Sequence, residues 1–95
     1  MRALFVGGLV DNSELDMDRG LPPAHYPEDT GAGRPRYRLH HVGIHPSGTR
    51  ETDIAYAVYA APEMADAEVE RIASERDYAR RFEATPAPPP SALPV

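Results

Sequence analysis

The chain has 95 residues, a hydrophobic fraction of 41%, a charged fraction of 26%, no cysteine and a formal net charge of −5 at pH 7. This length fits one small domain, and the lack of cysteine excludes disulfide bonds, thiolate zinc sites and cysteine nucleophiles. The apolar stretch 3–10 is short and contains two glycines, so we expect neither a membrane span nor a signal peptide, and predict a cytoplasmic protein.

The N-terminal segment predicts a β-hairpin. Residues 2–6 are rich in strand formers and are followed by two glycines, and residues 11–13 are the turn-forming Asp-Asn-Ser. Residues 14–18 alternate between acidic and apolar side chains, which is the pattern of a half-buried strand. We therefore expect the acids of this second strand to be exposed, with Leu15 and Met17 buried.

A long loop is predicted to follow the hairpin. Residues 19–35 contain four prolines and three glycines, a composition that does not sustain regular structure. Strand character resumes over residues 37–44 and again over residues 52–60. In the latter strand both faces are apolar, with Ile54, Tyr56 and Val58 expected on one face, which indicates a central strand or one covered by a partner.

The C-terminal third predicts one helix and a tail. Pro62 suits a first helical turn, Asp66 is an alternative N-cap, and acids cluster early in the segment, as the helix dipole favours. From residue 84 onward proline dominates, so we expect residues 84–95 to be a disordered Pro-rich tail and residues 1–83 to be a single domain. One apolar stripe at helical spacing runs along the helix: Ala65, Val69, Ile72, Ala73, Ala79 and Phe82.

The predicted fold class is α+β: a small antiparallel β-meander of about four strands with one C-terminal helix packed on a face. The core of such a domain is thin, and a homodimer or a partner over the second face of the 52–60 strand would add to it.

Charge is divided into three blocks. Residues 1–33 carry a net charge of −4, residues 34–50 carry +4, and residues 51–95 carry −5. The basic block contains three histidines and interleaves arginines with a tyrosine, as nucleic-acid surfaces do, but the acidic balance of the chain argues against direct nucleic-acid binding. The simplest arrangement pairs Arg36 and Arg38 with the acids of residues 14–18 across neighbouring strands.

The histidines do not predict a metal site. His40 and His41 are adjacent on a predicted strand, so their side chains should point to opposite faces, although His40 and His45 could meet across a turn. The two glycines at 7–8 lack the spacing of a phosphate loop, and no serine lies in a nucleophile elbow. We expect no cofactor, no metal and no catalytic residue.

The order of these features resembles small uncharacterised accessory proteins of bacteriophages and prophages. The resemblance rests on the 2–8 strand with its Gly-Gly end, the Glu-Leu-Asp-Met at 14–17, the Tyr-Arg-Leu at 37–39, the Ala-Val-Tyr at 57–59 and the acidic helix over 63–71. It implies a mobile-element protein that acts in the host cytoplasm by binding and blocking a host factor.

Two binding hypotheses follow, with a structural virion component as a third. The first is a non-enzymatic inhibitor of a host protein, such as a nucleic-acid-handling defence complex (anti-CRISPR-like), that binds through an acidic surface with Tyr59 and Tyr78 as exposed anchors. The second is a small ligand- or metal-binding module built on the basic strand and the 19–35 loop. The acidic surface comprises Glu14, Asp16, Asp18, Glu63, Asp66 and Glu70, and the alternative ligand site comprises Arg36, Arg38, His40 and His45.

Overall fold

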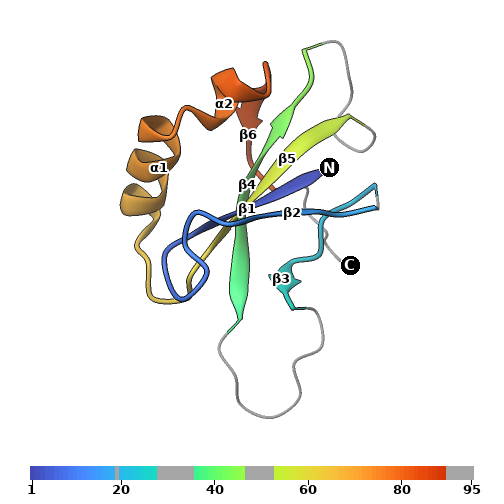
Figure 1. Cartoon of the computed structure of the whole chain (residues 1–95). Helices are drawn as coiled ribbons and strands as arrows, with labels where there is room; N and C mark the ends of the chain where they lie inside the picture. Colours follow the sequence, from blue (N-terminus) through green and yellow to red (C-terminus); the bar gives the residue numbers. More distant parts are fainter. Residues whose placement is uncertain (19, 28–35, 47–52, 90–95) are drawn as a thin grey trace.

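A computed structural model of the chain describes residues 1–18, 20–27, 36–46 and 53–89. The described residues form one mixed β-sheet with two short helices against one of its faces (Figure 1). The elements, in chain order, are β1 (Arg2–Val6), β2 (Glu14–Asp16), β3 (His25–Tyr26), β4 (Tyr37–Ile44), β5 (Ile54–Ala60), α1 (Asp66–Glu75), α2 (Tyr78–Arg81) and β6 (Thr85–Ala87).

The sheet has the strand order β2-β1-β5-β4-β3, and β6 pairs with the same edge of β4 that β3 uses. The α+β class is confirmed, but the antiparallel meander is wrong, because β1 and β5 are neighbours and run parallel. β1 and β4 pair with the two edges of β5, so this strand is central. Its two apolar faces are covered by separate core clusters on the two sides of the sheet.

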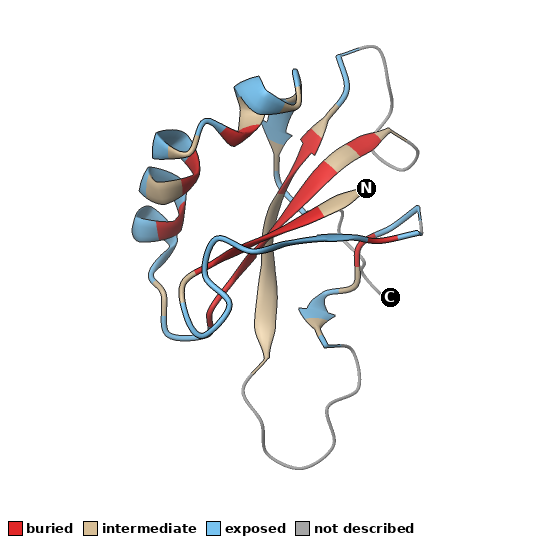
Figure 2. Cartoon of the chain, in the orientation of Figure 1, coloured by how far each residue is buried: buried red, intermediate tan, exposed pale blue. Residues whose placement is uncertain are grey.

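The first core cluster fills the space between the sheet and the helices. Leu4 and Val6 of β1 and Val58 of β5 meet Val69 of α1 and Tyr78 of α2, and all five are buried. Figure 2 shows buried residues along β1 and β5 and on the side of α1 that faces the sheet. Two members of the predicted apolar stripe, Val69 and Ala73, are therefore core residues. Packing in this cluster holds both helices against the sheet.

The second core cluster lies on the opposite face of the sheet. Phe5 and Tyr59 stack with their ring centroids 5.7 Å apart, and Tyr26 packs against both rings. The hydroxyl of Tyr59 donates a hydrogen bond of 2.7 Å to the carbonyl oxygen of Pro23. Met17, Pro23 and Tyr26 thus cover a face of β5 that the sequence alone left open to a partner, and the central position predicted for β5 is confirmed.

The predicted hairpin forms, but its second strand is shorter than expected. Met17 is buried, whereas Leu15 is 37% exposed, so the prediction that both side chains point inward is wrong for Leu15. β2 is an edge strand of three residues, and Met17 lies beyond its end, where its backbone N–H donates to the carbonyl of Met1. The loop predicted over residues 19–35 contains the two-residue strand β3, and residues 19 and 28–35 lie outside the described part.

A β-bulge reverses the direction of one side chain in β5. Gly43 of β4 is opposite Tyr56, whereas the next residue, Ile44, is opposite Ile54, so Ala55 is the extra residue. Ile54 consequently packs in the second cluster and does not share a face with Tyr56, contrary to prediction. Gly43 lies directly beneath the Tyr56 ring, where an added Cβ atom would be 2.1 Å from Cε2.

The helix predicted to run to Phe82 is interrupted. Arg76 caps α1, and Asp77 takes a left-handed conformation (φ 62°, ψ 38°), after which α2 adds a single turn. The break turns the chain so that Tyr78 enters the core. The predicted tail is also wrong at its start, because Thr85–Ala87 form β6; residues 90–95 lie outside the described part.

Candidate ligand-binding cavity

The acids predicted on β2 are partly neutralised by arginines. Nε of Arg2 lies 3.3 Å from Asp16 and 3.8 Å from Glu14, and the Arg81 guanidinium of α2 donates to Glu14 at 2.9 Å. Asp18 is exposed and makes no ion pair with any residue in the described ranges. The β2 part of the predicted acidic surface is therefore a mixed cluster of both charges.

The acids near α1 behave differently from one another. Asp66 lies 3.2 Å from Arg38 and 3.6 Å from Nε2 of His40. Arg38 was predicted to pair with the acids of β2, and this prediction is wrong, because β5 and β1 separate β4 from β2. Arg38 pairs with Asp66 of α1 instead. Glu63 and Glu70 are exposed and have no ion-pair partner within the described segments.

Neither tyrosine predicted as an exposed anchor is on the surface. Tyr59 is 0% exposed and Tyr78 is 2% exposed, because each ring fills one of the two core clusters. Tyr59 alternates with smaller residues in an apolar run, and that signal favours burial over exposure. Tyr78 lies among charged residues and has no such signal in the sequence.

The predicted basic ligand site is only partly assembled. Arg38 and His40 both reach Asp66, and Arg38 also donates to the carbonyl of Met64 at 2.6 Å. His45 is exposed at the far end of β4, beside Asp53, and does not join them. Arg36 precedes β4 and is half-buried.

A second bulge brings His40 and His41 to the same face of the sheet. Leu39 is opposite Tyr59 and His41 is opposite Val58, so His40 is the extra residue of β4. The prediction that the two rings point to opposite faces is wrong for this reason. Their Nδ1 atoms are 2.7 Å apart, which requires one nitrogen to carry a hydrogen and the other to present its lone pair.

These histidines line a cavity of about 590 Å³ between the helices, β4, β5 and the β6 segment. The helix contributes Glu70, Ala73 and Ser74, and Asp77 follows at the break; their spacing of three, one and three residues places them on one face. The volume lies in the range of small-molecule sites. The other walls are formed by His40, His41, Tyr56, Tyr78, Ala79, Pro86, Ala87, Pro88 and Pro89.

Burial changes the chemistry of two of these groups. Desolvation, and secondarily the neighbouring His40, lower the pKa of His41 to about 4, so its imidazole is neutral at pH 7. Desolvation also raises the pKa of the Tyr56 hydroxyl. The cavity therefore presents neutral imidazole and phenol groups beside the carboxylates of Glu70 and Asp77.

Sequence reasoning identified His40 and Glu70 of this cavity, but assigned them to different sites. It missed Ser74 and Asp77, whose helical spacing from Glu70 was the available signal. The contribution of β6 had no such signal, because the strand itself contains Pro86 and is followed in the cavity wall by Pro88 and Pro89.

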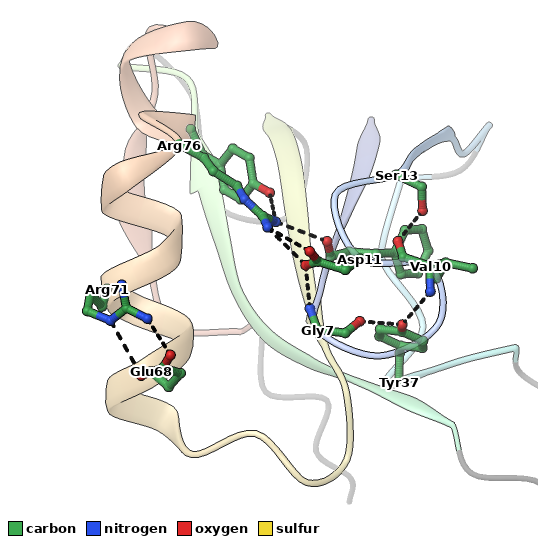
Figure 3. Close-up of polar contacts among 10 residues, drawn as sticks. Gly7, Val10, Asp11, Ser13, Tyr37, Glu68, Arg71 and Arg76 are labelled. Carbon is green, nitrogen blue, oxygen red and sulfur yellow. Dashed lines mark hydrogen bonds and ion pairs between the residues drawn. The ribbon is translucent and has the colours of Figure 1, made fainter.

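The loop between β1 and β2 is the second surface feature of note (Figure 3). Asp11 accepts a hydrogen bond of 2.7 Å from the Gly7 N–H and a two-pronged contact of 2.9 and 3.0 Å from Arg76. The Tyr37 hydroxyl donates to the Gly7 carbonyl and accepts from the Val10 N–H at 3.1 Å. These contacts fix the loop, and they leave the Leu9 side chain fully exposed at its tip.

Residues 1–18, 20–27, 36–46 and 53–89 contain neither a metal-binding cluster nor a membrane-spanning helix. In these ranges no three His, Cys, Asp or Glu side chains converge as a metal-binding group. The helices there are also too short and too polar for any of them to cross a membrane.

Comparison of the chain with protein-family models, with curated proteins and with solved structures found no match.

Proposed function

We propose that the protein reversibly binds a small organic molecule in the cavity between α1, α2, β4 and the β6 segment. One observation carries the proposal: a cavity of about 590 Å³ that is lined mainly by aromatic, alanine and proline residues, with a few polar residues among them. Ligand sites have this composition, because apolar walls supply affinity and a few polar groups supply orientation.

The proposal is tested by NMR titration of the ¹⁵N-labelled chain with neutral aromatic probes, indole and tryptophol. We expect shifts in the amides of Ala73, Ala79 and Ala87, which line the cavity from three segments. Ser74→Trp should abolish these shifts, because Ser74 is an exposed helical residue at the cavity wall and a bulky side chain there fills the space.

Glu75→Trp is the matched control. Glu75 is also exposed on α1, but it lies outside the cavity and pairs with Arg71, which keeps its second partner Glu68. Binding should persist in this variant. Shifts that are absent for both probes, or that survive Ser74→Trp unchanged, would contradict the proposal.

A second candidate is the inhibitor that the sequence predicts, a protein that binds a host protein. The exposed Leu9 favours it, because an apolar side chain on a loop already fixed by hydrogen bonds loses little entropy when it enters a partner's pocket. Capture of the partner from host extract should fail for Leu9→Ser and persist for Leu21→Ser, a control with another exposed leucine. Loss of capture only in an Asp16→Arg/Asp18→Arg variant would instead support the acidic surface.

A further inference from the structure

The charges around the cavity are unbalanced. Its lining contains the carboxylates of Glu70 and Asp77 and no arginine. Arg80 is the one arginine that contacts either of these carboxylates among the described residues, at 3.8 Å from Asp77, and its side chain is 86% exposed. An exposed pair at this distance is largely screened by water, so most of the negative charge remains.

Other arginines near the cavity are engaged elsewhere. Arg76 donates to Asp11 and to the hydroxyl of Tyr78, and Arg38 is held by Asp66 and a backbone carbonyl. Both guanidinium groups therefore have carboxylate partners outside the cavity. Neither Arg76 nor Arg38 lines the cavity.

The histidine pair can supply at most one positive charge against the two carboxylates. With the Nδ1 atoms 2.7 Å apart, the rings of His40 and His41 cannot both carry a hydrogen at Nδ1, so the pair holds at most one proton more than its neutral form. Desolvation disfavours that proton on His41. A neutral imidazole nitrogen with a free lone pair accepts a hydrogen bond from an ammonium group.

The remaining walls favour a flat, apolar body. The Tyr56 ring contacts two other rings of the lining, with its centroid 6.2 Å from those of both His41 and Tyr78. Prolines and alanines complete the surface without adding any charge. Aromatic rings also attract cations through their negative faces.

We propose that the ligand of this cavity is a small aromatic amine with one positive charge, whose ammonium group is held by Glu70 and Asp77 and whose ring packs against the Tyr56 wall. The inference rests on the proposed ligand-binding function and adds the chemical class of the ligand.

Three indole probes that differ in charge test the inference. Tryptamine is a cation at pH 7, tryptophol is neutral and indole-3-propionate is an anion. In NMR titrations followed at the cavity-lining amides, we expect tryptamine to bind at least about tenfold more tightly than tryptophol, with the propionate weakest; a tenfold ratio corresponds to about 1.4 kcal/mol.

Variants locate the source of the preference. Glu70→Gln/Asp77→Asn should bring tryptamine to the affinity of tryptophol while leaving tryptophol binding in place. Asparagine tolerates the left-handed backbone at position 77, so the fold is expected to survive. The control Glu75→Gln/Glu83→Gln removes two exposed carboxylates outside the cavity and should keep the preference.

The outcomes separate the two proposals. Equal affinity for tryptamine and tryptophol at the cavity overturns the inference about charge and leaves ligand binding standing. A preference for tryptamine that survives the Glu70→Gln/Asp77→Asn change also overturns it. Shifts that are absent for all three probes overturn both proposals together.

Discussion

Lowering the pH from 7 to 5 is expected to destabilise the fold through the imidazole of His41. Desolvation in the cavity wall, with the neighbouring His40 as a smaller cause, lowers the pKa of this group from 6.5 to about 4. The unfolded chain therefore binds a proton in a pH range where the folded chain does not. The stabilising contribution is complete above pH 6.5 and is lost as the pH falls towards 4.

The magnitude follows from the two pKa values. Each unit of difference corresponds to about 1.4 kcal/mol, so the full effect of His41 is about 3 kcal/mol. About 2 kcal/mol of this falls between pH 7 and pH 5. Carboxylates such as Asp11, whose pKa is lowered by the hydrogen bond from the Gly7 N–H, titrate below this window.

Urea unfolding at pH 7 and pH 5 measures the effect. The wild type should lose about 2 kcal/mol of unfolding free energy over this interval, and His41→Gln should lose much less, because its side chain does not titrate. His45→Gln is the control, since this histidine is exposed and outside the cavity. An NMR titration of the His41 ring tests the same reasoning without a variant; an equal loss in wild type and His41→Gln, or a ring that titrates near pH 6.5, would refute it.

Three further changes test the packing, each by urea unfolding at pH 7. Gly43→Ala should cost about 1–3 kcal/mol or prevent folding, because its new Cβ atom would overlap the buried Tyr56 ring; an unchanged midpoint would show that the ring can move away. Asp11→Ala should cost about 1–2 kcal/mol through loss of the Gly7 N–H and Arg76 contacts, and a double variant with Arg76→Ala should cost less than the sum of the two. Tyr59→Phe removes one buried hydrogen bond and should cost about 1 kcal/mol, whereas a neutral result would mean that its carbonyl partner finds another donor.

Local signals in the sequence were sufficient for some elements. The apolar run of β5 predicted a central strand, and Val69 and Ala73 at helical spacing predicted the buried side of α1. In both cases the pattern within one segment determines which residues are buried. The α+β class follows from these elements together.

Features that depend on distant residues were not predictable in the same way. The parallel pairing of β1 with β5 joins segments about fifty residues apart, and nothing within either segment encodes it. The bulge at His40 is set by the register between β4 and β5. Because of it, the rings of His40 and His41, expected on opposite faces, lie on the same face and share a hydrogen bond. The cavity combines three such non-local effects, since its walls come from β4, the helices and β6.

The helix break shows the limit of periodicity as a signal. Apolar residues continue at helical spacing through Phe82, yet Asp77 adopts a left-handed conformation and ends the first helix at Arg76. Aspartate is among the few residues that tolerate this conformation, but many aspartates in helices do not use it. Burial of the Tyr78 ring in the core accompanies the change of direction.

The outer edge of β4 has a consequence for self-association. Unpaired strand edges invite other chains to add strands, and proteins limit this with short edge strands, prolines and bulges. Here β3 covers one end of β4 and β6, which contains Pro86, covers the other. His40, the bulge residue of the β4–β5 pairing, lies between these two covered stretches. β6 thus protects this edge of the sheet from other chains. Its deletion is expected to open one wall of the cavity and to leave Val42–Ile44 unpaired, as a template for aggregation.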